Sequence, residues 1–150
     1  MGGEAPKRIF VSGVNGHIGN HIVRDLLEHG YMVRGSVRDL NDPMRTEHVR
    51  THAKDLGCED RLELVEGDVL DADGWASRMG GCDGLFHTAT IYSTRGTATE
   101  ILDTANKGTT HLLHAAAEAM PKDHIAVHTG PCGQSPTLYC HTALLFQEAV

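Results

Sequence analysis

The sequence predicts an α/β protein with a doubly wound parallel sheet, the Rossmann fold, of about five strands in the order 3-2-1-4-5. Short β-rich apolar runs alternate with longer segments of helical periodicity, which is the pattern of βαβ units. A glycine-rich turn joins the first apolar run to the first helical segment. The chain has 150 residues and shows no linker, so residues 1–150 are expected to form a single domain.

The first half of the chain contains two predicted strands, each followed by a helix. Residues 8–12 are apolar on both faces, as expected for a buried parallel strand. Apolar side chains in residues 16–29 fall at helical spacing, and Gly30 ends that helix. Residues 31–37 are a second β-rich run, and the polar residues 43–56 that follow it are predicted to be a helix.

The second half repeats this alternation three times. Its β-rich runs and its helical segments are separated by glycine or proline, which end such elements. The predicted strands are residues 62–65, 84–87 and 125–128, and the predicted helices are residues 72–79, 100–120 and 138–150.

The balance of charges limits the partners. Lys and Arg total 13 and Asp and Glu total 20, which gives a net charge of −7. A field of that sign repels phosphate backbones and anionic lipid, so neither nucleic acid nor a membrane surface is an expected partner. A local basic pocket for a small anion is compatible with this net charge.

The cysteines and the first residues bear on location. Residues 1–7 lack the apolar segment of a secretion signal, and no apolar run reaches the ~20 residues of a membrane span. We therefore expect a cytoplasmic protein whose thiols are reduced and mostly buried. The four cysteines are Cys58, Cys82, Cys132 and Cys140, and no two of them form a CxxC pair.

The glycine turn is the most informative segment. Residues 13–19 have Gly-x-x-Gly-x-x-Gly spacing directly after a strand and at the opening of a helix. Gly13 permits a tight turn, Gly16 lets a pyrophosphate approach backbone N–H groups, and Gly19 lets the helix pack against the sheet. The alternative is that three glycines merely make a tight connection. The predicted cofactor-binding residues of this turn are Gly13, Asn15, Gly16, His17, Ile18 and Gly19.

The end of the second strand bears on the choice of cofactor. A fold that binds NAD has an acidic residue about 20 positions after the turn, and Asp39 lies near that distance. Val37 occupies the expected strand-end position, however, and Arg38 follows it. A guanidinium there suits a 2′-phosphate, so we favour NADP(H) over NAD(H) and expect Arg34 to add charge if it faces the same crevice. In the alternative interpretation, Arg38 and Asp39 pair on the surface.

Several segments together resemble a known family. The chain is similar to the extended short-chain dehydrogenase/reductases, within the NAD-dependent epimerase/dehydratase superfamily. The similarity is greatest to the branch of dihydroflavonol and cinnamoyl-CoA reductases. The matching segments are residues 11–19, 33–39, 67–71, 85–90 and 106–109.

The resemblance implies further contacts to the cofactor. Asp68 and Val69 correspond to a segment along the adenine, although an Asp after Gly is as often a local turn former. Residues 88–90, which are Thr88, Ala89 and Thr90, correspond to a segment beside the nicotinamide. The helix over residues 100–120 packs a homodimer in many relatives, and core packing alone is the alternative.

The resemblance also implies the catalytic groups. The family reduces a carbonyl by hydride transfer and uses a Ser or Thr together with Tyr-x-x-x-Lys. The candidates here are Tyr139 and Thr129, with Ser135 as a further hydroxyl, but Ala143 stands in the Lys position. We expect this chain to lack the family's C-terminal substrate domain. Two hypotheses follow: an NADP(H)-dependent reductase domain acting on a small carbonyl substrate, and a non-catalytic dinucleotide-binding module or truncated remnant.

Histidine pairs raise the question of a metal site. His17 and His21 are four residues apart, as are His48 and His52, and both pairs lie on predicted helices. This spacing can hold a metal, but the sequence places no third ligand beside either pair. We therefore predict no metal site.

Overall fold

The computed structural model describes residues 5–89, 97–120 and 126–128, and these residues form an α/β fold. Five parallel strands make one sheet in the order β3-β2-β1-β4-β5, which confirms the predicted fold class and strand order. The predicted helix over residues 138–150 lies outside the described residues. The strands are β1 (Arg8–Ser12), β2 (Met32–Val37), β3 (Leu62–Glu66), β4 (Gly84–His87) and β5 (Ala126–His128).

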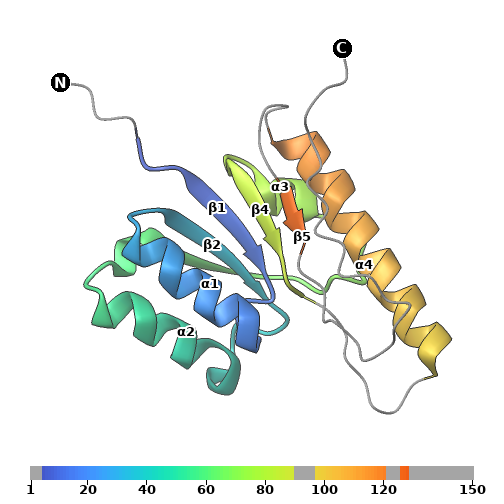
Figure 1. Cartoon of the computed structure of the whole chain (residues 1–150), viewed down its shortest axis with the longest axis horizontal. Helices are drawn as coiled ribbons and strands as arrows, with labels where there is room; N and C mark the ends of the chain where they lie inside the picture. Colours follow the sequence, from blue (N-terminus) through green and yellow to red (C-terminus); the bar gives the residue numbers. More distant parts are fainter. Residues whose placement is uncertain (1–4, 90–96, 121–125, 129–150) are drawn as a thin grey trace.

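Helices cover both faces of the sheet. In Figure 1, α1 and α2 lie together at the lower left and α4 lies on the right, while α3 overlaps β4 and β5 in this view. Side chains of α3 and α4 pack into one part of the core, on the face opposite to α1 and α2. This three-layer arrangement follows from the crossover connections of parallel strands. The helices are α1 (His17–Glu28), α2 (Pro43–Asp55), α3 (Trp75–Met79) and α4 (Ala98–Ala119), with a 3₁₀ turn at Glu59–Arg61.

Two helix starts differ from the predicted ones for local reasons. The α3 helix begins at Trp75 rather than at residue 72 because Gly74 is left-handed, with φ of 79°, and interrupts the helical backbone. The α4 helix begins at Ala98 rather than at residue 100. Thr97 and Glu100 form a reciprocal capping box there, in which each side chain accepts from the other's backbone N–H.

The apolar core has one part on each face of the sheet. Successive side chains of β1 point to opposite faces, so Phe10 packs towards α3 and α4 while Val11 packs towards α1 and α2. On the first face, the ring of Phe10 meets that of Trp75 edge-on, with centroids 6.2 Å apart. Burial on both faces explains why the middle of β1, residues 9–11, is continuously apolar rather than alternating.

The described cysteines behave as predicted. Cys58 and Cys82 are buried and their thiols are free, one in each part of the core. Burial raises the pKa of the Cys82 thiol. Cys132 and Cys140 lie outside the described residues. No helix in the described part of the chain combines the length and the apolar character that crossing a bilayer requires.

Candidate cofactor site

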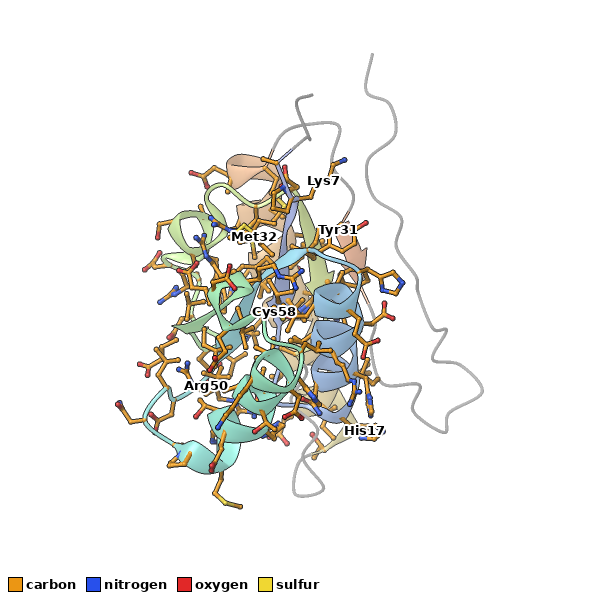
Figure 2. All side chains as sticks on the ribbon, turned by 90° about the vertical axis from the view of Figure 1, so that its left-hand side faces the viewer. Lys7, His17, Tyr31, Met32, Arg50 and Cys58 are labelled. Atoms are coloured by element: carbon orange, nitrogen blue, oxygen red, sulfur yellow. The ribbon has the colours of Figure 1, made fainter. Side chains whose placement is uncertain are left out.

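A pocket of about 330 Å³ lies where the strands end. Its walls come from the segments that follow β1, β3 and β4 and from the end of β2, which all reach the same edge of the sheet. Figure 2 shows His17 at this end of the molecule and Lys7 and Tyr31 at the other. The lining residues are Gly13, Asn15, Gly16, His17, Ile18, Gly19, Ser36, Val37, Arg38, Arg45, Gly67, Val69, Thr88 and Ala89.

The glycine turn forms the floor of this pocket. Gly13 has φ of 70°, and a Cβ there would lie 2.8 Å from the α-carbon of Ala89. The N–H groups of Gly13 and Val14 donate to the carbonyl of Ser36, at 3.1 and 3.2 Å, and so fasten the turn to β2. Among the described residues, a Cβ on Gly16 would meet only the Gly13 carbonyl oxygen, at 3.3 Å. Position 13 is therefore closed by protein, whereas position 16 is open to a ligand.

The start of α1 differs from the starts of the other long helices. In α2 and α4, the side chains of Asp42 and Thr97 accept hydrogen bonds from N–H groups of the first turn. In α1 the N-cap residue is Gly16, and within the described chain no side chain caps that turn. The first N–H groups of an α-helix have no partner inside the helix. They can therefore bind an anion in the pocket, helped by the helix dipole.

Two arginines line one end of the pocket. Arg38 is exposed just beyond the end of β2, as predicted. Arg45, which sequence reasoning missed, comes from the first turn of α2, where its Nε lies 2.8 Å from Oδ2 of Asp42. Pro43 is the first residue of α2, as proline often is in helices. The sequence therefore contained a signal for Arg45, because it placed that residue in the first turn of the helix after β2. Two guanidinium groups therefore adjoin one concave surface.

Arg34 does not lie at the pocket. Its side chain is only 13% exposed, and its Nε donates to Glu63 on β3 at 2.8 Å. Its Nη1 donates to the carbonyl oxygens of Arg78 and Gly80, at 2.9 and 2.8 Å, near the end of α3. The condition for Arg34 to add charge to the crevice is thus not met, because its position in mid-strand directs it to the neighbouring elements.

Residues after β4 line the opposite side of the pocket. Thr88 and Ala89 are among the lining residues, and Thr90 lies outside the described part of the chain. The backbone N–H groups of Thr88 and Ala89 donate to the hydroxyl of Ser12, at 3.1 and 3.2 Å. The segment after β4 is therefore anchored to the end of β1.

The segment after β3 contributes one side of the pocket. Val69 lines the pocket and is buried, whereas Asp68 is not among the lining residues. The Oδ1 atom of Asp68 accepts from the N–H of Leu70 at 2.9 Å. This is an Asx turn, and it matches the local-turn alternative for Asp68.

The remaining candidates concern catalysis and metals. Tyr139, Thr129, Ser135 and Ala143 all lie outside the described residues. Within the described ranges, no three side chains of His, Cys, Asp or Glu come together as a metal would require.

The histidines on α1 and α2 lie near one another. The rings of His17 and His21 have centroids 5.0 Å apart. Burial, followed by the nearby charge of Arg24, lowers the pKa of His52. Its Nε2 is a buried atom that has no hydrogen-bond partner among the described residues.

Comparison with known proteins identifies relatives of this chain. The sequence profile of the family described as NAD(P)H-binding matches residues 13–142. A cinnamoyl-CoA reductase of Medicago truncatula is 35% identical over 113 residues, which cover 74% of this chain and 34% of that protein. Cinnamoyl-CoA reductase 1 of Arabidopsis thaliana is 37% identical over 119 residues, which cover 79% of this chain and 33% of that protein. The chain thus spans about a third of the length of these curated relatives.

Solved structures of similar fold include two reductases. Vestitone reductase from alfalfa superposes with a TM-score of 0.60 at 27% identity, covering 81% of this chain and 35% of that one. The yeast methylglyoxal/isovaleraldehyde reductase, solved with NADPH, superposes with a TM-score of 0.62 at 25% identity, covering 82% of this chain and 36% of that one.

Proposed function

The chain belongs to the NAD(P)H-binding family and to the extended short-chain dehydrogenase/reductases, and we propose that it forms a single domain that binds NADPH for carbonyl reduction. The observation that carries the proposal is the uncapped start of α1, which opens into a pocket with two arginines at one end. The relatives named above are reductases, which supports the same class of reaction.

Each part of a dinucleotide would meet a different group of the lining residues. The N–H groups at the start of α1 would bind the pyrophosphate, and the missing side chain of Gly16 leaves the space for it. Gly67 and Val69 would flank the adenine, with Asp68 beside them. Backbone dipoles hold an anion without side-chain charge, so the net charge of −7 does not oppose binding.

The arginines favour NADPH over NADH. Only NADPH carries a 2′-phosphate on its adenosine ribose, and a guanidinium binds phosphate through charge-assisted hydrogen bonds. Arg38 and Arg45 both line the pocket near the end of β2, where the adenosine ribose lies in this fold. Asp42 neutralises part of the charge of Arg45 but also holds its guanidinium in place.

The other end of the pocket would receive the nicotinamide, against Thr88, Ala89 and Thr90. Bound NADPH supplies a hydride, and the chain would hold the carbonyl substrate and protonate its oxygen. We propose Tyr139 as the proton donor and Thr129 as the hydroxyl that polarises the carbonyl. With Ala143 in the place of a Lys, Tyr139 lacks the ammonium that assists it in the family, so we expect weak turnover.

The second hypothesis, a dinucleotide-binding module without catalysis, rests on Ala143. Like the first hypothesis, it predicts that the chain binds NADPH. Unlike the first, it predicts that no carbonyl substrate is reduced. A homodimer through α4 is a separate proposal, supported by the 40% exposure of Leu102 on that helix.

Thermal melting with millimolar NADPH or NADH tests the binding claim. A ligand at 100 times its dissociation constant adds about 2.7 kcal/mol of stability, so NADPH should raise the melting temperature clearly and more than NADH does. Gly16→Val, which fills the open position, should abolish the shift. An unchanged melting temperature with both nucleotides would refute the proposal. Steady oxidation of NADPH with a panel of aldehydes and ketones would then separate the reductase from the non-catalytic module.

A further inference from the structure

A chain of hydrogen bonds beneath the pocket connects β1, β4 and α4. Ser12 Oγ lies 2.7 Å from Nδ1 of His87, and Nε2 of His87 lies 3.2 Å from Oγ1 of Thr109. Ser12 and His87 are 0% and 1% exposed. None of the three side chains lines the pocket. These buried polar groups therefore lie directly beneath Thr88 and Ala89, which do line it.

The hydrogen-bonding capacity of Ser12 decides the direction of the first bond. A hydroxyl has one proton to donate and two lone pairs that accept. Both lone pairs are used, because the N–H groups of Thr88 and Ala89 donate to this oxygen. The contact with His87 must then use the hydroxyl proton of Ser12. Nδ1 of His87 is accordingly the acceptor and carries no hydrogen.

This direction defines the state of the imidazole. A neutral imidazole with a bare Nδ1 carries its proton on Nε2. That N–H points to the hydroxyl oxygen of Thr109, which can accept it. An imidazolium would instead donate to Ser12 from Nδ1, and the oxygen would then have to release one of the two backbone N–H groups. Of the states of the imidazole, the neutral Nε2–H tautomer alone satisfies at once the bonds described here for Ser12, His87 and Thr109.

We propose that His87 is a positioning residue of the cofactor site, whose bare Nδ1 orients the Ser12 hydroxyl so that it holds the backbone of Thr88 and Ala89 against the glycine turn. The proposal rests on the proposed function, since those two residues matter for NADPH only if the pocket binds it. The packing there leaves little slack, because a Cβ on Gly13 would already lie 2.8 Å from the α-carbon of Ala89. A small displacement of that segment therefore changes the shape of the pocket.

The tautomer can be measured directly on the unmodified chain. Imidazole ¹⁵N shifts distinguish a bare from a protonated nitrogen, and the His87 signal is assigned by its loss in His87→Asn. At pH 7 we expect a bare Nδ1 and a protonated Nε2. A protonated Nδ1, in either the other tautomer or the imidazolium, would overturn the proposal.

Two variants of His87 separate positioning from mere filling of space. In His87→Asn, the amide oxygen can take the place of Nδ1 and accept from Ser12, whereas His87→Leu has similar bulk and no acceptor. We expect His87→Leu to weaken NADPH binding about tenfold, the effect of losing one buried hydrogen bond, and His87→Asn to restore most of that loss. Dissociation constants from NADPH fluorescence are compared under conditions where circular dichroism shows both variants folded.

A double variant provides an independent test. Ser12→Ala should weaken NADPH binding as His87→Leu does, and the pair together should lose no more than the stronger single variant, because both break one chain of bonds. Additive losses, or equal affinities for His87→Asn and His87→Leu, would refute the positioning role while leaving NADPH binding itself intact. Absence of binding by the unmodified chain would instead overturn the proposed function, and the positioning role with it.

Discussion

Gly19 lies so close to the carbonyl oxygen of Gly13 that no side chain fits between them. A Cβ at position 19 would overlap that oxygen and would also lie 2.8 Å from Oγ1 of Thr88. The Gly13 oxygen accepts from Gly16 N–H within the turn, and Thr88 is hydrogen-bonded to Ser12. Because neither neighbour moves freely, Gly19→Ala should force the start of α1 away from the sheet. We expect a loss of about 1–3 kcal/mol in the free energy of unfolding, the range for overpacked sites. Urea unfolding followed by the fluorescence of Trp75, the one tryptophan in the chain, measures it.

Gly16→Ala is the matched variant for ligand binding. In the part of the chain that the structure describes, its Cβ would meet only the Gly13 oxygen, at 3.3 Å, so the free energy of unfolding should change by less than about 1 kcal/mol. The added methyl would occupy space assigned to the pyrophosphate, and NADPH affinity should fall about tenfold or more. If this variant binds NADPH as tightly as the unmodified chain, the pyrophosphate does not bind at the start of α1.

The two arginines of the pocket should control the choice between nucleotides. Arg38→Ala and Arg45→Ala should each weaken NADPH binding about tenfold, because each removes a charge-assisted hydrogen bond to the 2′-phosphate. NADH affinity should stay nearly constant in both variants. Arg50→Ala is the control, since Arg50 is exposed on the same helix as Arg45 and does not line the pocket. Titration of each variant with both nucleotides gives the ratio of affinities, and an equal fall for NADPH and NADH would contradict this assignment.

The sequence predicts a residue of the site well when that residue directly follows a strand, and poorly when its position depends on packing between elements. Ten of the proposed cofactor contacts line one pocket, and most follow directly after strands, where sequence order alone brings them to one edge of the sheet. Arg45 lies beyond a turn, and its place depends on how α2 packs against α1. Arg34 is the opposite case. Its charge suggested contact with a bound cofactor, but its side chain instead connects β2 to β3 and α3 through hydrogen bonds. The spacing of residues along the sequence therefore predicts which of them reach this edge of the sheet. It does not predict the tertiary contacts of Arg34 and Arg45.

Arg34 should therefore matter for stability and not for cofactor choice. Arg34→Met keeps much of the apolar length but leaves the carbonyl oxygens of Arg78 and Gly80 without this donor. We expect a loss of about 1–3 kcal/mol in the free energy of unfolding and an unchanged ratio of NADPH to NADH affinity. Arg24→Met is the control, because the exposed pair of Arg24 with Glu28 contributes only about 0.3–0.5 kcal/mol. Similar unfolding midpoints for these two variants would count against this role.

His52 should make the fold less stable in acid. Its pKa is lowered in the folded chain, first by burial and then by the charge of Arg24, with His48 and His21 adding to the effect and Asp55 opposing it. The unfolded chain therefore binds the proton more readily, so stability falls as pH drops through the ordinary value of 6.5 and stops falling below the lowered folded pKa. His29 has the opposite sign, because hydrogen bonding to the Asp25 carbonyl raises its pKa, and its contribution is lost as pH rises through that raised value. Urea midpoints between about pH 8 and 5, around the ordinary histidine pKa, should fall less towards acid in His52→Leu and more in His29→Gln than in the unmodified chain. If both variants follow the unmodified chain across this range, neither histidine couples folding to pH.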